Sequence, residues 1–405
     1  MTDKAPHTVT VSRQGNHLEL VAEGSWEAGY RTPEAFAEAM GVDADTWVIT
    51  SGKPRSWPTS GWDQENGRPW SVLNHYQNFT MVRRKPVALH PQVQPVRINA
   101  KRRGPRRPGR VHHGLEATVF ITDPHFGFLR DLRTGQLTPF HDRRVLDVAL
   151  QIVQRLRPRR VIWGGDMLDL PDWSDKFLRS PEFYYTTQPS IIEAAWWLAQ
   201  FRSAAPSADM AVLEGNHDAR MDKALLTHLS HAYELRAADE MHLPPSMSVP
   251  RLLALHQLGI EYVGGYPDAD LWLSDNCVVT HGDTVKSGPG ATVGAEVRDS
   301  YVTMVHGHIH RHERASRTIH ERYDQRIIQA VCPGCACHVD GRVPGRTSKQ
   351  NWQQGIAVIY HDARNRTQVT VAEVYDGECL FEGVLYRADE AARLQELREQ
   401  TEWDF

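Results

Sequence analysis

The sequence has no long apolar run and few cysteines, and each shortage excludes a class of protein. No window of its 405 residues approaches about eighteen consecutive apolar residues, so we expect no membrane span. Charges are scattered through residues 1–30, which therefore do not resemble a signal peptide. Five cysteines, an odd number, do not make a disulfide framework in a chain of this length. We therefore expect a cytoplasmic protein with reduced thiols.

Acidic residues are missing from one segment of the chain. Residues 81–113 contain ten Lys and Arg but no Asp or Glu, whereas the whole chain has a net charge of −4. The remaining residues therefore carry 36 basic side chains against 50 acidic ones, a balance of −14. Such a basic stretch, densest over residues 101–110, fits either a solvated linker or a segment that neutralises nucleic-acid phosphates.

The overall composition is that of a globular protein, with 40% hydrophobic and 24% charged residues. We expect a small N-terminal α+β domain over residues 1–82, with a helix over 32–42 and strands over 47–50 and 71–82. A basic, Pro/Gly-rich linker should cover residues 83–114. The catalytic domain should cover 115–385, and a charged C-terminal helix should cover 386–405.

Strand and helix patterns alternate from residue 117 onward, as in an α/β fold. The expected strands are 117–122, 160–163, 210–213, 277–280 and 301–305, and the first expected helices are 142–157 and 191–202. A run of antiparallel strands should follow these elements. The alternation predicts a sheet whose strand ends meet along one edge.

Polar residues with metal-binding side chains follow each of these five strands. They are Asp123 and His125; Asp166 and Asp169; Asn216, His217 and Asp218; His281 and Asp283; and His308 and His310. Because ligands bind at the carboxyl ends of strands in α/β sheets, these blocks should converge on one pocket. Imidazole and carboxylate together suit Mn, Fe, Zn, Ni or Co better than Ca or Mg.

The spacing within the blocks also suits metal ions. Asp-x-His and His-x-His place two side chains on the same side of an extended segment. A carboxylate such as Asp166 can bridge two cations about 3.5–4 Å apart. The glycines that precede Asp166, Asn216 and His308 should relieve crowding where the chain passes the metals. The pattern therefore predicts a site for two divalent cations.

These blocks resemble the motifs of the calcineurin-like metallophosphoesterase family. That pattern is Asp-x-His, Gly-Asp-x-x-Asp, Gly-Asn-His-Asp/Glu, a lone His and Gly-His-x-His, and the chain matches every block, in order, over residues 117–312. The resemblance implies a four-layer αββα sandwich, here with the small N-terminal α+β domain added. It also implies an enzyme that hydrolyses phosphomonoesters or phosphodiesters with two divalent metal ions, Mn²⁺ being the first expectation.

The resemblance assigns a role to each matching residue. Asp123, His125 and His310 would hold the first metal, Asn216, His281 and His308 the second, and Asp166 would bridge them. His217 would not be a ligand; it would protonate the leaving oxygen or stabilise the phosphoryl charge, and Asp218 would orient it. Asp169 would contact the metal ligands without binding a metal itself. Attack by a hydroxide bridging the two metals would follow.

Within the family, the basic linker and the added N-terminal unit favour a nuclease or nucleotide phosphodiesterase, with nucleic acid or a nucleotide as its partner. The chain is also similar to bacteriophage-encoded metallophosphoesterases, in its Trp-rich N-terminal part and in residues 334–355. Alternatives are a phosphomonoesterase for small molecules, a cyclic-nucleotide phosphodiesterase, and a non-catalytic nucleic-acid-binding scaffold that keeps its metals. His217 and Asp218 argue against the scaffold, because neither is needed only to hold ions.

Two further patterns have a structural and a functional interpretation. Cys332, Cys335 and Cys337 include a Cys-x-x-Cys zinc spacing, but a turn with buried thiols is favoured because no second pair lies nearby. Trp173 and Tyr184 follow the second block and are candidates for stacking on a nucleobase, whereas Trp196 and Trp197 have the spacing of a helix core.

Overall fold

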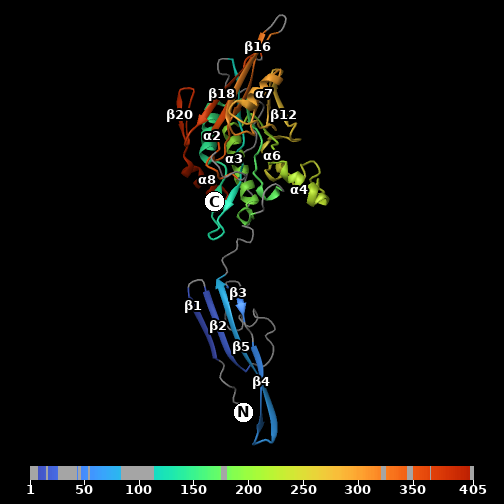
Figure 1. Ribbon diagram of the computed structural model, residues 1–405, viewed down its shortest axis with the longest axis vertical. Helices are drawn as coiled ribbons and strands as arrows, with labels where there is room; N and C mark the ends of the chain where they lie inside the picture. The colour runs from blue at the N-terminus through green and yellow to red at the C-terminus, as the bar shows by residue number, and fades with distance from the viewer. Residues whose placement is uncertain are drawn as a thin grey trace. The chain divides into compact units, whose positions relative to one another are not determined.

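The computed structural model describes residues 8–14, 17–25, 43, 47–52, 55–83, 114–174, 180–320, 325–343, 350–364 and 366–401 (Figure 1). The chain divides into two compact units, Met1–Gln92 and Val93–Phe405. The expected linker over 83–114 lies almost entirely outside the described residues. Within the described part of the chain, no helix is both long enough and apolar enough to cross a membrane.

The described part of the N-terminal unit is an antiparallel sheet, drawn in blue in Figure 1. Its strands are β1 (Thr8–Gln14), β2 (His17–Ser25), β3 (Trp47–Gly52), β4 (Arg55–Asp63) and β5 (Arg68–Arg83). The long strand β5 pairs with β2, β3 and β4, so it organises the sheet. The expected strands are confirmed here, whereas the helix expected over 32–42 lies outside the described residues.

The larger unit contains a six-stranded sheet in the order β11-β10-β9-β6-β17-β18. These strands are β6 (Glu116–Ile121), β9 (Arg160–Trp163), β10 (Asp209–Leu213), β11 (Glu261–Val263), β17 (Gln354–His361) and β18 (Thr367–Val374). β6, β9, β10 and β11 run parallel, and β17 and β18 are antiparallel additions. The carboxyl ends of β6, β9 and β10 therefore lie along one edge.

A second, five-stranded sheet has the order β12-β13-β14-β16-β15. Its strands are β12 (Asp270–Ser274), β13 (Cys277–Thr280), β14 (Thr303–His306), β15 (His312–His320) and β16 (Gln325–Pro333). β13 and β14 are parallel neighbours, so the residues that follow them also share an edge. The strands expected over 277–280 and 301–305 are confirmed to within about two residues.

Apolar side chains fill the space between the two sheets, and helices cover the outer faces. Residues from both sheets form the central layer, among them Phe120, Ile162, Leu213, Val279 and Val305. The alternate residues of β6, Val119 and Ile121, pack instead with α2 (Arg143–Leu156) and α3 (Thr187–Ala204). On the other side, α7 (Ala291–Asp299) packs on β16. The expected αββα sandwich is therefore confirmed.

Local sequence explains where the first long helix begins and how the helical layer packs. Asp142 caps α2, because its side chain accepts a hydrogen bond from the Arg144 amide. Trp196 and Trp197 of α3 are buried in the core, as their helical spacing predicted. α8 (Glu390–Thr401) packs beside α2 through the ion pair of Arg393 with Asp147 at 2.7 Å.

Shorter elements complete the larger unit. They are the hairpins β7 (Phe128–Arg130) with β8 (Leu137–Pro139) and β19 (Glu378–Phe381) with β20 (Val384–Arg387), the helices α4 (Arg220–His228), α5 (Val249–Leu252) and α6 (Leu255–Leu258), and the 3-10 turns Pro171–Trp173, Pro181–Phe183 and Ser230–Ala232. All five cysteines are free and buried, which agrees with the expected reduced thiols.

Candidate metal centre

The five polar blocks follow five strand ends and meet in one place. Asp123 and His125 follow β6, Asp166 and Asp169 follow β9, Asn216 to Asp218 follow β10, His281 follows β13, and His308 and His310 follow β14. The first three blocks come from the six-stranded sheet and the last two from the five-stranded sheet. The centre therefore lies where the ends of the two sheets adjoin.

One half of the centre is formed by the first and last blocks together with Asp166. The ligand atoms of Asp123, His125 and Asp166 lie within 4.8 Å of one another. His310 Nε2 is 3.1 Å from Asp123 Oδ1 and 3.1 Å from His125 Nε2. His125 Nε2 is 3.6 Å from Asp166 Oδ2. Two imidazole nitrogens and two carboxylates thus face one point.

The other half of the centre shares Asp166 with the first. The ligand atoms of Asp166, His281 and His308 also lie within 4.8 Å of one another. His281 Nε2 is 3.4 Å from Asp166 Oδ1 and 3.1 Å from Asn216 Oδ1. Because Asp166 belongs to both groups, it occupies the position that a bridging carboxylate would need.

The structure thus brings together all seven residues predicted as ligands. Asp123 is joined to the last block directly, because its carboxylate accepts hydrogen bonds from the His308 amide at 2.9 and 3.1 Å. Asn216 belongs to the cluster through its contact with His281, whose Nε2 lies 3.1 Å from Asn216 Oδ1. Their proximity is a structural finding, and their role as ligands remains a prediction.

Charge pairing dominates the electrostatics of the centre. Burial alone would raise the pKa of Asp123 and Asp166, but the neighbouring His310 and His281 lower both pKa values. Burial opposes protonation of His281, yet the charge of Asp166 raises the pKa of His281 to about 10. Burial lowers the pKa of His308 to about 4. Several negative charges are therefore concentrated among ring nitrogens, an arrangement that a divalent cation complements.

Backbone strain is concentrated at the same residues. Asp123, His125, Asp166, His308 and His310 all have positive φ angles, between 49° and 68°. This left-handed region is sparsely populated by residues other than glycine, although asparagine, aspartate and histidine adopt it more often than most, and each such residue costs on the order of 1 kcal/mol. Strain of this kind persists where the surrounding structure holds it, and it is typical of functional sites.

Two glycines permit the close approach of backbone segments, as their positions before Asn216 and His308 predicted. A Cβ atom on Gly215 would lie 2.2 Å from both the amide nitrogen and Oδ1 of Asp166. A Cβ atom on Gly307 would lie 1.9 Å from Thr122 Oγ1 and 2.4 Å from Asp123 Oδ2. Any side chain at either position would displace a predicted ligand.

His217 lies beside the centre, and its hydrogen-bond partner corrects one expectation. Its Nδ1 is 3.0 Å from Asp169 Oδ1 and 3.0 Å from the Asp169 carbonyl oxygen. Asp169 Oδ1 is also 2.9 Å from His125 Nδ1. The residue that orients His217 is therefore Asp169 and not Asp218. The same oxygen fixes one predicted ligand and the predicted proton donor.

Asp218 has a different position from the one expected. Its carboxylate accepts hydrogen bonds from the backbone amides of Met167, Leu168 and Gly215, at 2.9 to 3.1 Å. Burial, followed by the charge of Asp166, raises the pKa of Asp218. Asp218 therefore ties the loop after β9 to the loop after β10, so it positions Asp166 through the backbone.

Arg220, at the start of α4, is a site residue that the sequence analysis did not identify. Its guanidinium donates to the Asp169 carbonyl oxygen at 2.6 Å and lies 2.8 Å from His217 Nε2. Its spacing, three residues after His217 on a helical turn, is the signal that was available. A cation is therefore held next to the predicted proton donor.

The donor set fits divalent cations. The ring nitrogens and carboxylate oxygens suit Mn, Fe, Zn, Co or Ni. Asp169 Oδ2 and His310 Nδ1 are buried yet have no hydrogen-bond partner among the described residues, which is unusual for buried polar atoms.

The two aromatic residues predicted to contact substrate have different surroundings. Trp173 packs partly against the core, and its indole nitrogen donates to Thr187 Oγ1 at 3.2 Å. Tyr184 is 43% exposed. Packing therefore accounts for Trp173, and Tyr184 is the one of the two with a free ring surface. A stacking role stays a prediction for both residues.

Comparisons with known proteins give structural neighbours and a family match. Similar solved structures include a 5'-nucleotidase precursor from Thermus thermophilus (11% identity, 70% of this chain and 58% of that chain, TM-score 0.33). A second is a purple acid phosphatase from yellow lupin, Lupinus luteus (9% identity, 92% of this chain and 73% of that chain, TM-score 0.31). A third is a putative 5'-nucleotidase from Staphylococcus aureus (16% identity, 71% of this chain and 58% of that chain, TM-score 0.31).

The chain thus spans 58% of the length of each nucleotidase. A search of curated proteins found no match. Residues 117–312 match the family model for calcineurin-like phosphoesterase, and this span begins within β6 and ends at the first residue of β15, just after the last of the five blocks. The chain is therefore similar to calcineurin-like phosphoesterases over residues 117–312.

Proposed function

We propose that this protein hydrolyses phosphodiester bonds in nucleic acid or nucleotides by using two divalent cations. The observation that carries the proposal is the convergence of seven metal-binding side chains, from five strand ends in two sheets, around the shared carboxylate of Asp166. Such a donor set is suited to two-metal phosphoryl transfer.

The chain's residues divide into two ligand groups. Asp123, His125 and His310 would hold the first cation, Asn216, His281 and His308 the second, and Asp166 would bridge them. When bound, the cations would neutralise phosphate charge and activate water as the nucleophile. Mn²⁺ is the first expectation, and Fe, Zn, Ni and Co have the same ligand preferences.

His217 would donate a proton to the oxygen of the leaving group. Its side chain is 13% exposed, whereas those of His125 and Asp166 are 2% exposed, so substrate can reach the His217 ring more readily than the His125 ring. Asp169 holds its Nδ1, so Nε2 is the atom that would transfer the proton to the leaving oxygen once it is released from its hydrogen bond with Arg220. In the structure Nε2 accepts a hydrogen bond from Arg220 at 2.8 Å, and the positive charge of Arg220 would attract a phosphoryl oxygen.

Two features of the sequence support a diester of nucleic acid over a small monoester. The basic segment over residues 101–110, outside the described residues, would bind a phosphate backbone in a salt-dependent manner. The resemblance to bacteriophage-encoded members expected from the sequence would agree with a role in nucleic-acid metabolism, and it names no substrate. Tyr184, and less so Trp173, would stack on a base.

The role of His217 is tested with His217→Asn, assayed on bis-p-nitrophenyl phosphate with Mn²⁺. We expect kcat to fall about 10²–10⁴-fold while the metal content stays that of the wild type. His320→Asn, at an exposed histidine at the end of β15, is the matched control and should keep full activity. Wild-type protein that binds two metals but turns over no phosphoester would support the scaffold alternative instead.

The substrate class is tested by comparing single-stranded DNA, duplex DNA, RNA, cyclic nucleotides and p-nitrophenyl phosphate at one metal concentration. Neutralising Arg102, Arg103 and Arg106 with glutamine in the full-length chain should weaken binding of polymers and flatten its salt dependence, and leave small diesters unaffected. Preference for the monoester or for cyclic nucleotides would favour the corresponding alternative.

A further inference from the structure

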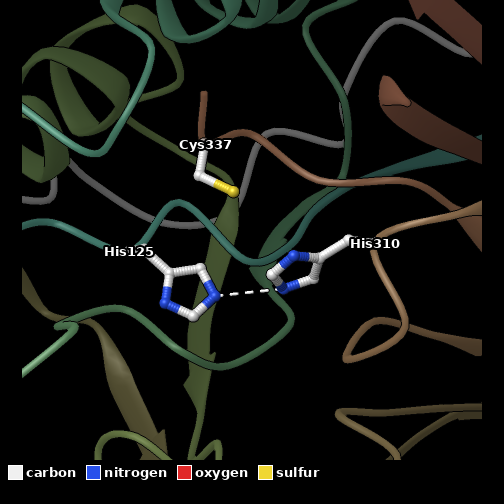
Figure 2. Close-up of side chains that lie close together, drawn as sticks. All are labelled: His125, His310 and Cys337. Atoms are coloured by element: carbon white, nitrogen blue, oxygen red, sulfur yellow. Dashed lines mark hydrogen bonds between the residues drawn. The ribbon is translucent and has the colours of Figure 1, made fainter. Parts of the chain in front are cut away.

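A cysteine thiol lies at the first half of the metal centre, in addition to the predicted ligands. The sulfur of Cys337 and ring nitrogens of His125 and His310 all lie within 4.8 Å of one another. Figure 2 shows the sulfur pointing toward the two imidazole rings, which are joined by their Nε2 atoms. All three residues are at least nine-tenths buried. The thiol therefore lies beside two of the predicted ligands of the first cation, His125 and His310.

The backbone around Cys337 is fixed to the segment that carries the first block. The amide of the preceding residue, Ala336, donates to the Thr122 carbonyl at 3.0 Å and to the Asp123 carbonyl at 3.3 Å. The Cys337 carbonyl accepts from the Gln354 side chain at 2.8 Å. Cys337 also forms an isolated β-bridge with His141. The position of the sulfur is thus set by several backbone contacts.

The neighbouring cysteines have other surroundings. The Cys332 thiol donates to the Gly307 carbonyl at 3.7 Å, and the Cys335 thiol donates to the Gln353 carbonyl at 3.5 Å. Among the described residues, neither belongs to a group of side chains that could hold a metal. The side chain of Cys337 is hydrogen-bonded to that of Cys335 and belongs to such a group.

A second feature of this place is an unpartnered buried nitrogen. His310 is 6% exposed, and its Nδ1 has no hydrogen-bond partner among the described residues. His310 Nε2 faces Asp123 and His125, so the cation would be held by Nε2, and the unpartnered Nδ1 needs a partner of its own on the other side of the ring. Thiolate and imidazole together are typical ligands of zinc, iron and cobalt.

We propose that Cys337 is a further ligand, as a thiolate, of the cation held by Asp123, His125 and His310. This inference rests on the proposed two-metal function. Binding forms a metal–sulfur bond and breaks the S–H bond, and the proton leaves to solvent. The first position would then prefer a thiophilic cation such as zinc, iron or cobalt over Mn²⁺, and the second position would not. The Cys-x-x-Cys spacing, formed by Cys332 and Cys335, would not itself supply the ligand.

The test uses the full-length protein, stripped of metal and reloaded with Co²⁺. We expect a sulfur-to-cobalt charge-transfer absorption in the near ultraviolet for the wild type. The matched controls Cys332→Ser and Cys335→Ser should retain the absorption, and Cys337→Ser should lose it. Cys337→Ser should also weaken binding of Zn²⁺ about 10–100-fold, and change binding of Mn²⁺ by about threefold or less.

The outcomes separate this inference from the function on which it rests. Wild-type protein that binds two Co²⁺ ions without the sulfur absorption would refute the role of Cys337 and leave the two-metal proposal standing. Protein that binds no Co²⁺, Zn²⁺ or Mn²⁺ would refute both. The wild-type spectrum decides the question even if Cys337→Ser does not fold, and far-ultraviolet circular dichroism reports the folding of each variant.

Discussion

Asp169 is the residue whose replacement tests most of the proposed site at once. Its Oδ1 lies 2.9 Å from His125 Nδ1 and 3.0 Å from His217 Nδ1. It therefore holds both rings with their Nε2 atoms directed to the centre. Asp169→Asn keeps the size of the side chain, removes the negative charge and offers a competing N–H donor. We therefore expect weaker metal binding through His125 and slower proton transfer by His217.

The size of each effect follows from these contacts. Loss of a carboxylate behind a metal-binding histidine typically weakens metal affinity about 10–100-fold, which is about 1.4–2.7 kcal/mol. Loss of the carboxylate that fixes the tautomer of a catalytic histidine reduces kcat by up to about 10⁴-fold. At saturating metal we therefore expect kcat to fall about 10²–10⁴-fold, and at limiting metal the loss should be larger.

The assay separates the two contributions. A metal titration followed by calorimetry gives the affinities, and turnover of bis-p-nitrophenyl phosphate at saturating Mn²⁺ gives kcat. Asp270→Asn, at an exposed aspartate at the start of β12, is the control and should change neither quantity. If Asp169→Asn folded and retained both the metal affinity and the kcat of the wild type, the assignment of Asp169 as the positioning residue would be refuted.

Two further substitutions test the scaffold around the centre. Gly215→Ala should destabilise the protein by about 1–3 kcal/mol and reduce activity about 10²-fold, because the added Cβ would lie 2.2 Å from Asp166. Thermal melts measure the loss of stability. Gly294→Ala in α7 is the control, because a Cβ at that position meets no atom within 4 Å. Glu193→Gln should cost about 3–5 kcal/mol in urea unfolding, because the buried Arg143 and His141 lie 2.8 and 2.9 Å from that carboxylate. Burial raises the pKa of Glu193, but His141 and Arg143 hold it well below its ordinary value. The difference in unfolding free energy between the wild type and Glu193→Gln should therefore be full above about pH 4.3 and shrink as the pH falls below that value. A difference that did not change with pH would contradict the assignment to the charge of Glu193.

The sequence was sufficient to predict the sandwich and the seven clustered residues, for a physical reason. Side chains that follow parallel strands must meet at a sheet edge, so order along the chain implies proximity when each block follows a strand. β6, β9 and β10 satisfy this condition in one sheet, and β13 and β14 satisfy it in the other. The family resemblance supplied what periodicity alone could not, namely that two separate sheets would contribute.

The partners of individual side chains were less predictable. Asp218 follows His217 directly, yet adjacent residues on a turn point in different directions, and Asp218 bonds to backbone amides instead. Asp169 reaches His217 from another strand end, a contact that no local spacing encodes. The approach of Cys337 to His310 likewise depends on how the chain returns after β16. Local pattern predicts which edge a residue occupies, whereas tertiary packing decides what it touches.

Because the donors come from two sheets, the apolar layer between those sheets determines how far apart the two groups of donors lie. Phe120, Ile162 and Leu213 on one side and Val279, Val305 and Val331 on the other are ordinary core residues with no polar atom to offer. Their combined thickness nevertheless acts as a spacer that sets the gap across which His281 and His308 approach Asp166. Exchange of one such side chain for a bulkier one would move His281 and His308 relative to Asp166, so core residues that offer no polar atom help to set the geometry of the centre.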